Sequence, residues 1–232
     1  MVAIATFWLT LPGVSHLQKS FPESTALIDA RAAEAKEHGR AARRAWHPVP
    51  LAQISPRLQE AVVDSEDARF FLHGGLDLIE TQNALDKALD DGKLGRGAST
   101  ITQQLAKNLW LGEERSLWRK LREAAMAERL ETLGKERILE LYLNVVEWGD
   151  GIYGAEAASQ RWFGVHAREL SPEQAAILAA MLPAPRKRNP RKPSARLKRR
   201  AAEVLELFGM YKQLSPGELE SARERLHALL GG

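Results

Sequence analysis

Two adjacent carboxylates, Glu66 and Asp67, stand just before an aromatic pair, Phe70 and Phe71, in the stretch SEDARFFLHGGLD. Aromatic neighbours can desolvate a carboxylate and raise its pKa, as a general acid or base requires. Taken alone, such a pair is more often a solvated charge pair at a helix end. His73 has no second histidine at metal-binding spacing, so we expect it to have a structural hydrogen-bonding role.

A second set of polar residues fills the stretch GRGASTITQQLAKNLWL. Ile101, Leu105 and Leu109 recur four residues apart, which predicts a helix with one apolar stripe. Its opposite face would carry Gln103 and Lys107. A glycine-containing loop before a helix suits a phosphate, although the Gly-Lys-Ser/Thr of a P-loop is missing. The alternative is a capped helix with a solvated polar face.

A third carboxylate, Glu123, lies three residues after Lys120, so the two share one helix face. This pair has two interpretations. It is either a surface ion pair of little energetic value, or the second carboxylate of a glycosyl-transfer site whose cations neutralise a diphosphate. The helix that carries the pair is expected at 116–133, and the side chains expected to face a core are Leu117, Leu121, Ala124, Ala125 and Leu130.

Capping signals divide the rest of the chain into helices. Ser55-Pro56, Asp77 with Glu80, Ser171 with Gln174, and Ser215 with Glu218 each predict a helix start. No run of alternating apolar and polar residues indicates a strand, and the glycine-rich stretch 147–154 is expected to be a loop. Further helices are expected at 24–45, 135–144 and 155–163, so the predicted fold is all-α.

The N-terminal residues Val2 to Leu11 are mostly apolar, but a spanning helix needs roughly 20 such residues. They fit equally a short apolar helix or the trailing half of a membrane anchor. The sequence therefore divides into a partial membrane anchor or apolar segment at 1–17, a polar helical linker at 18–49 and a main domain at 50–232.

Charge and cysteine usage exclude several classes of protein. The chain has no cysteine, which excludes disulfides, cysteine zinc sites and a cysteine nucleophile. Nine lysines and arginines crowd residues 186–200 without any aromatic residue, so a nucleic-acid partner is not expected. This basic segment suits anionic lipid headgroups, and an equally good interpretation is a solvated loop without a role.

Taken together, four stretches resemble the successive motifs of the peptidoglycan glycosyltransferases, glycosyltransferase family 51. They are EDARFFLHGGLD, GRGASTITQQLAKNLWL, RKLREAAMAERLETLGKERILELYLN and EWGDGIYGAEAASQRWFGVHARELSPEQAAILAAMLPAP. The resemblance runs from about residue 50 to about residue 208, and the phrases GASTITQQLAKNL and ILELYLN are diagnostic of that family. Because the chain ends at residue 232, we expect the monofunctional type, without a transpeptidase domain.

The resemblance implies a reaction and roles for particular residues. Lipid II, a disaccharide-pentapeptide on undecaprenyl diphosphate, would be polymerised into β-1,4-linked glycan strands with inversion and release of undecaprenyl diphosphate. By the family match, Glu66 is the general base and Glu123 is the second essential carboxylate. The positions that match the family's substrate cleft are Arg69, Ser99, Thr100, Gln103, Gln104, Lys107 and Lys120.

The resemblance also implies an architecture and a location. The family fold is a lysozyme-like helical lobe with a smaller membrane-facing lobe, the latter within roughly 70–125. The enzyme would work at the bacterial cytoplasmic (inner) membrane, with its catalytic domain on the periplasmic or outer face. Its expected partners are lipid II, the growing glycan strand, membrane lipids and other cell-wall synthases. No cofactor or metal site is expected, although Mg²⁺ or Mn²⁺ could stimulate the reaction.

Two other functions compete with this hypothesis. A lysozyme-like glycan-cleaving enzyme would share the fold and a catalytic glutamate, but it would have no use for a diphosphate-binding cluster of Gln103, Lys107 and Lys120. A catalytically silent scaffold would need neither Glu66 nor Glu123.

Overall fold

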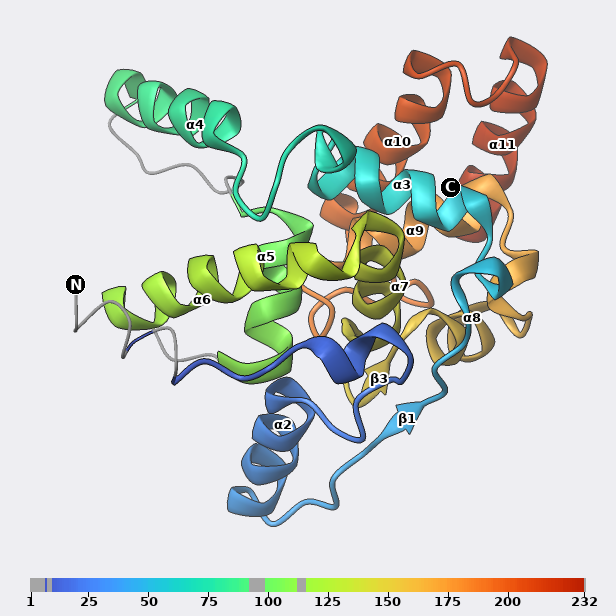
Figure 1. The fold of residues 1–232 in the computed structure, drawn as a ribbon. Coiled ribbons are helices and arrows are strands. Elements are labelled where there is room, and N and C mark those ends of the chain that lie inside the picture. The colour runs from blue at the N-terminus through green and yellow to red at the C-terminus, as the bar shows by residue number, and fades with distance from the viewer. Residues whose placement is uncertain (1–6, 8–9, 92–98, 112–115, 232) are drawn as a thin grey trace. The chain divides into compact units, whose positions relative to one another are not determined.

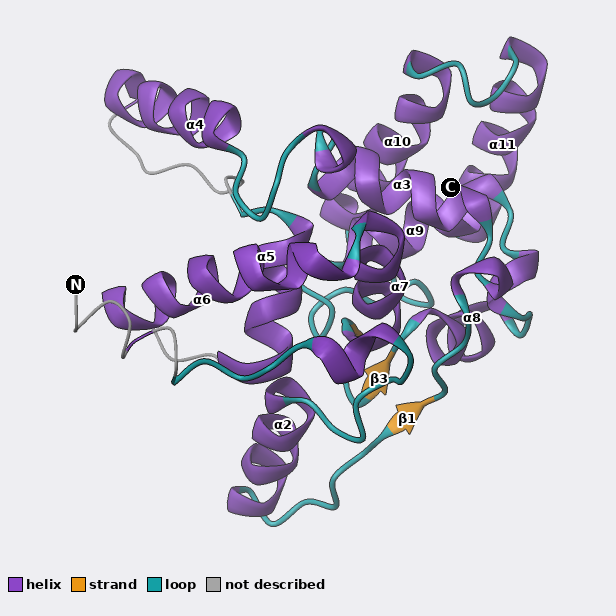
Figure 2. Ribbon diagram, viewed as in Figure 1, coloured by secondary structure: helices purple, strands orange, loops and turns teal. Residues whose placement is uncertain are grey.

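A computed structural model describes residues 7, 10–91, 99–111 and 116–231 of the chain (Figure 1). The described residues are mostly helical, as the capping signals predict (Figure 2). The helices are α2 (Ala26–Glu37), α3 (Pro56–Glu66), α4 (Leu78–Asp91), α5 (Ile101–Ala106), α6 (Leu117–Leu130), α7 (Lys135–Val145), α8 (Ala155–Phe163), α9 (Pro172–Met181), α10 (Ala195–Met210) and α11 (Pro216–Leu229).

The chain forms two compact units. Unit 1 comprises Met1–Ala30 and Arg69–Tyr142, and unit 2 comprises Arg31–Ala68 and Leu143–Gly232. The chain therefore passes from one unit to the other directly after α3, between the EDA and RFF of the first sequence motif.

The core of unit 2 is built around α9, which packs against α3, α10 and α11. Helix α9 starts after Ser171 as predicted, and Gln174 Oε1 accepts from Ser171 N at 3.0 Å. Ile177 and Leu178 are fully buried, as are most of their neighbours on every side of the helix. A short helix that is apolar all round can exist in water only when it is covered on all faces, and these packing helices cover it.

A small three-stranded sheet in unit 2 corrects the strand-free prediction. Its strands are β1 (Ala45–Trp46), β2 (Glu147–Gly149) and β3 (Ile152–Tyr153), in the order β1-β3-β2. Figure 2 labels β1 and β3. β1 runs parallel to β3, and β2 runs antiparallel to β3 with a register shift between Glu147 and Gly149. Strands of two or three residues are too short to show an alternating pattern, and β1 pairs with a segment far away in sequence.

In unit 1, α6 packs against α5. The prediction of which α6 side chains face a core is only partly confirmed. Ala125 and Leu130 are buried as predicted, but Leu117 is 93% exposed and Leu121 is 52% exposed. The helix instead buries Met126 and Ala127, together with Glu123. Heptad-like spacing identifies the apolar positions of a helix, but it does not establish that a protein core covers all of them.

Several predicted helix limits shift by a few residues. The helix expected at 24–45 is α2, which ends at Glu37; Gly39 follows with φ +64° before the chain becomes extended in β1. Asp77 does cap α4, because its Oδ1 accepts hydrogen bonds from the backbone N–H groups of Ile79 and Glu80, each at 3.0 Å. The predicted break at Gly134 is confirmed, with φ +82°.

Two expectations fall wholly or largely outside the described residues. Most of the apolar run Val2 to Leu11 lies there, and so do residues 92–98 of the loop expected before α5. Among the described residues, the longest apolar helical stretch falls short of what crossing a membrane requires.

Candidate active site

Glu66 is the last residue of α3, whose N-cap is the predicted Ser55. Leu58, Ala61 and Val62 bury the inner face of this helix as expected. The next residue, Asp67, ends the helix and donates its N–H to the carbonyl of Val63 at 2.8 Å. This arrangement leaves Glu66 half-buried on a helix end anchored in the unit 2 core.

A buried arginine that the sequence did not single out lies within electrostatic reach of Glu66. Arg188 is 9% exposed and donates to the carbonyl oxygen of Ala180. Its burial, followed by the charges of Arg196 and Arg200, lowers its pKa, whereas the charge of Glu66 acts in the opposite direction. The solvated-loop interpretation of 186–200 is therefore wrong for Arg188. Nothing in its local pattern distinguishes it from the other cations of that segment.

Glu123 lies in unit 1 at the centre of a charge cluster on α6. The residue is only 3% exposed, and its carboxylate accepts from Arg119 Nη1 at 2.6 Å and from Lys120 Nζ. Lys120 also donates to Ser99 Oγ at 3.2 Å. A carboxylate this deeply buried needs paired cations, so the surface ion-pair interpretation is wrong. Arg119 was missed, although its position four residues before Glu123 follows the same helix rule as Lys120.

The two cations of this cluster are not buried to the same degree. The side chain of Lys120 is 46% exposed, whereas that of Arg119 is 19% exposed. Lys120 can therefore contact a ligand while the buried carboxylate holds its stem in place. Ser99, an exposed residue of the preceding motif just before α5, accepts a hydrogen bond from the same ammonium group.

Thr100 and Gln103 form a capping box at the start of α5. Thr100 Oγ1 donates to the carbonyl of Gly75 at 2.7 Å, and Gln103 Oε1 accepts from Thr100 N at 3.0 Å. Gly75 itself has no room for a side chain, since a Cβ there would lie 2.6 Å from the backbone of Ala127 on α6. The box thus joins the glycine loop, α5 and α6.

The alternative interpretation of this stretch, a capped helix with a solvated polar face, is right about the cap and wrong about the solvated face. Gln103 is 4% exposed and Thr100 is 3% exposed, so both side chains serve the fold first. The apolar stripe of Ile101, Leu105 and Leu109 is buried as predicted. Whether Gln103 also contacts substrate stays a prediction, for which its amide nitrogen is the remaining donor.

Gln104 and Lys107 lie farther along the same stretch. Gln104 Oε1 accepts a hydrogen bond from the hydroxyl of Tyr142 at 2.9 Å. Lys107 begins a π-helical turn that ends at Leu111, a local geometry often found at functional sites. Lys107 is half-buried, and no ion pair links it to another residue that the structure describes. Its charge is therefore available to an anionic ligand.

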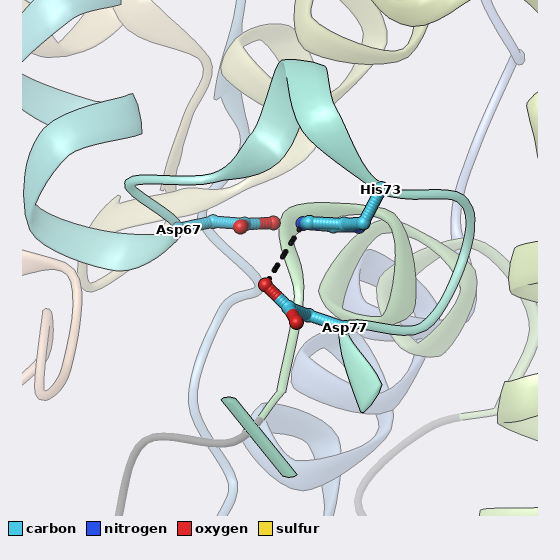
Figure 3. Close-up of side chains that lie close together, drawn as sticks. All are labelled: Asp67, His73 and Asp77. Atoms are coloured by element: carbon cyan, nitrogen blue, oxygen red, sulfur yellow. Dashed lines mark ion pairs between the residues drawn. The ribbon is translucent and has the colours of Figure 1, made fainter. Parts of the chain in front are cut away.

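Arg69 is positioned by Asp77, to which its Nε donates at 3.0 Å. Burial alone would raise the pKa of Asp77, but the N–H of Glu80 and the guanidinium of Arg69 together lower it below its ordinary value. His73 lies beside the same carboxylate, with Nε2 3.9 Å from Asp77 Oδ2 (Figure 3), while its Nδ1 lies 2.6 Å from the carbonyl of Gly74. These contacts fit the structural role expected for His73.

Unit 1 thus holds every predicted site residue except Glu66, which lies in unit 2. Within unit 1, direct bonds join Ser99 to Lys120 and Lys120 to Glu123, and a separate set of bonds orders the loop around Arg69 and Asp77. In this arrangement a buried carboxylate fixes a half-exposed ammonium group. Such a group can stabilise negative charge that develops on a leaving group.

Comparison with known proteins gives a consistent picture. The family model described as transglycosylase matches residues 33–208. The chain is similar to proteins named biosynthetic peptidoglycan transglycosylase from Nitrosospira multiformis (43% identity over 80% of this chain and 81% of that protein), Thiobacillus denitrificans (51% over 71% and 72%) and Alcanivorax borkumensis (43% over 94% and 86%).

Proposed function

Because the chain belongs to the transglycosylase family and is a peptidoglycan glycosyltransferase, we propose that it polymerises lipid II into β-1,4-linked glycan strands, with inversion and release of undecaprenyl diphosphate. The observation that carries this proposal is the cluster on α6, where the buried carboxylate of Glu123 holds Lys120 beside Ser99. A diphosphate leaving group requires positive charge of this kind.

In the proposed reaction, the carboxylate of Glu66 accepts the proton of the 4-hydroxyl group of the incoming lipid II. The hydroxyl oxygen then bonds to the anomeric carbon of the growing chain as the bond from that carbon to the diphosphate oxygen breaks. The electron pair leaves with the diphosphate, whose charge Lys120 and Lys107 would stabilise, and Glu66 later releases its proton to water. Half-burial on the end of α3 keeps this carboxylate within reach of a substrate hydroxyl.

Glu123 would act through the cations rather than on the transferred proton. Since Arg119 and Lys120 both donate to it, its carboxylate sets the direction in which the Lys120 ammonium group points. Arg69 and Ser99 would contact the substrate from the neighbouring loop and helix start. Cleavage of finished glycan strands, as in lysozyme, releases no diphosphate and so leaves this cluster without a purpose.

The proposed location is the outer face of the cytoplasmic membrane, because the substrate carries a polyprenyl tail. Exposed large apolar side chains on unit 1 support it, since such groups are expected to contact lipid. They are Phe71, Leu72, Leu78, Ile79, Leu117, Trp118 and Leu121.

The test is polymerisation of purified lipid II by the full chain, with glycan length read on a gel. We expect wild-type protein to make strands, and Glu66→Gln to lose about 10²–10⁴-fold in rate while remaining folded, as removal of a general base does. Glu60→Gln, on the same helix and paired with Arg57, is the matched control. Activity of folded Glu66→Gln within a few-fold of wild type would contradict the base assignment. Cleavage of preformed peptidoglycan without polymerisation would contradict the reaction.

A further inference from the structure

A cavity of about 370 Å³ lies within unit 2, and none of the site residues named above lines it. Its walls come from α2, from residues 40–43, from the turn that joins β2 and β3, and from Tyr153 of β3. Small-molecule sites typically measure about 300–1,000 Å³, so the cavity has room for a ligand of modest size.

Positive charge dominates the lining of this cavity. Four guanidinium groups and two carboxylates line it, which leaves two positive charges in excess. The arginines are Arg31, Arg40, Arg43 and Arg186, and the carboxylates are Glu34 and Asp150.

The inner arginines are already engaged in an ordered network. Arg186 binds Glu34 through two hydrogen bonds of 2.8 Å, and Arg31 lies 3.3 Å from the same carboxylate. The hydrogen bond with Arg186 in particular lowers the pKa of Glu34 to about 2. Arg31 also donates to Glu147 at 3.1 Å. These bonds hold the inner arginines in place without any ligand.

The outer arginines have no comparable partners. Arg43 is 77% exposed and reaches Asp150 only at 3.5 Å, and no ion pair joins Arg40 to another described residue. Their backbone is nevertheless held at both positions. Gly151, at φ +71°, lies so close that a Cβ there would come within 2.8 Å of the carbonyl oxygen of Arg43, and its own carbonyl accepts from Ala45 N at 2.8 Å. Arg40 N donates to the carbonyl of Ala35 at the end of α2, also at 2.8 Å.

An independent feature of the same cavity also indicates a ligand. Tyr153 is fully buried, yet its hydroxyl group has no hydrogen-bond partner among the described residues. Burial raises the pKa of this phenol, so it remains a protonated donor. Buried polar groups are nearly always paired, and an unpaired one in a cavity wall is explained when a ligand supplies the acceptor.

We propose that this cavity binds a small ligand through a phosphate group, with Arg40 and Arg43 holding the phosphate oxygens and the Tyr153 hydroxyl donating a further hydrogen bond. A phosphate monoester carries about −1.5 to −2 charges at neutral pH, which matches the excess charge of the lining. Guanidinium groups fit phosphate oxygens in a bidentate manner. A soluble phosphate ester and the headgroup of a phospholipid offer the same chemistry.

Binding to the full chain is measured by calorimetry with glycerol 3-phosphate and inorganic phosphate, and with glycerol as the uncharged control. Vesicles of phosphatidylcholine with or without phosphatidic acid form the lipid arm. We expect the phosphates or the phosphatidic acid vesicles to bind. Binding in one arm alone identifies the source of the phosphate, whereas no binding in any arm would overturn the proposal.

The double variant Arg40→Ala/Arg43→Ala should bind at least about tenfold more weakly, because it loses charge-assisted hydrogen bonds. Its matched control is Arg168→Ala/Arg199→Ala, which removes two exposed arginines whose ion pairs are also long, 3.7 Å each. In a Lys120→Ala background the same double change should weaken binding by the same factor, which separates this cavity from the proposed diphosphate site. Equal affinity of the Arg40/Arg43 variant and its control would overturn the proposal.

Tyr153→Phe distinguishes a binding site from a purely structural network. Since the hydroxyl has no partner in the unliganded protein, its removal should leave the melting temperature unchanged or higher. The variant should nevertheless bind the phosphate probe about threefold to tenfold more weakly. Unchanged binding would remove Tyr153 from the site. None of these readouts depends on lipid II, so the result is independent of the proposed polymerase activity.

Discussion

Helix α6 of unit 1 and helix α9 of unit 2 each bury one glutamate, Glu123 and Glu173, but they differ in where their apolar side chains lie. Helix α9 buries Ile177 and Leu178 completely and is enclosed by its neighbours. Helix α6 buries Glu123 and leaves Leu117 93% exposed. Burial of apolar surface is the main stabilising term in folding, so α9 is built for stability. Helix α6 gains less stabilisation from apolar burial, because it keeps a charge cluster and an exposed apolar surface. This is expected of a helix with a functional role.

The largest effect should come from neutralising the buried carboxylate of α6. Glu123→Gln keeps the size of the side chain but no longer holds Arg119 and Lys120 by charge. We expect lipid II polymerisation to fall about 10²–10³-fold, as for other preorganised electrostatic groups. Stability should fall by only about 1–2 kcal/mol, less than for a fully buried pair, because the Lys120 side chain is 46% exposed.

The measurement is polymerisation rate alongside urea unfolding, and the matched control is Glu128→Gln, an exposed glutamate on the same helix. If Glu123→Gln polymerised at the rate of Glu128→Gln, the cluster would be structural. The contrast between α6 and α9 would then lose its functional meaning.

One leucine from each helix tests whether the apolar side chains of α6 and α9 contribute differently to stability. Leu178→Ala on α9 empties a fully buried site and should cost about 2–5 kcal/mol of unfolding free energy. Leu117→Ala on α6 removes an exposed side chain and should change stability by less than about 0.5 kcal/mol. Chemical denaturation measures both. Similar losses in the two variants would mean that α6 packs as a core helix after all.

This leucine pair also marks the limit of prediction from sequence. Serine caps predict helix starts because the side chain bonds to the nearest backbone N–H groups, and Ser55 and Ser215 behave as expected. At Ser171 the helix starts as predicted, but its hydroxyl oxygen has no partner among the described residues, and Gln174 accepts from its backbone N–H instead. Leu117 and Leu121 follow the same apolar period as buried residues do. Their exposure depends on what surrounds α6 in the folded chain, which a local pattern does not encode.

In the candidate site, too, some contacts could be predicted from the sequence and others could not. Lys120 and Glu123 could be paired from sequence because helix geometry brings residues three apart together. Ser99 and Lys120 are 21 residues apart in sequence, and Arg188 and Glu66, whose charges interact, are much farther apart. Neither interaction could be predicted without the tertiary structure. The short strands β1 and β3 were missed for the same reason, since their pairing is non-local.

The cations of unit 1 should show smaller effects than the carboxylate that orients them. Lys107→Ala and Lys120→Ala should each lower turnover about tenfold, roughly the value of one charge-assisted hydrogen bond. Turnover number should fall more than substrate affinity, because the charge develops as the diphosphate leaves. Lys36→Ala, at an exposed position near the end of α2, is the control. Unchanged turnover in both variants would refute the diphosphate role.

The exposed apolar side chains of α6 predict a difference between the units in membrane binding. Replacing Leu117, Trp118 and Leu121 with serine should reduce flotation with lipid vesicles several-fold, by about 1 kcal/mol, since apolar contact with the bilayer is lost. The loss should persist at high salt, which screens only the charged contribution.

The control for this triple variant lies in unit 2, where Met210, Tyr211 and Leu229 are also exposed large apolar residues. Serine at those three positions should leave flotation unchanged. An equal loss in the control triple would show that apolar exposure, rather than its place on α6, determines binding.

The smallest predicted effect concerns two carboxylates that are removed from water and compensated differently. Glu123 has two cations, whereas Asp64 on α3 has, among the described residues, only the neutral amide of Gln213, which donates to it at 2.9 Å. Burial raises the pKa of Asp64, and the hydrogen bond from Gln213 only partly opposes that rise. The folded protein therefore favours the protonated form of this carboxyl group.

The sign of the pH dependence follows from that direction. A carboxyl group with a raised folded-state pKa contributes most to stability below its ordinary value of 3.8, and this contribution is lost as pH rises through the folded-state pKa. Asp64→Asn mimics the neutral form and keeps an acceptor for Gln213. We expect it to raise the unfolding free energy at about pH 7 by less than about 1 kcal/mol, and to have no effect at about pH 3. Urea unfolding at both pH values, with exposed Asp86→Asn as the control, measures this difference. A loss of stability at neutral pH would mean that positive charge compensates Asp64, as it does Glu123.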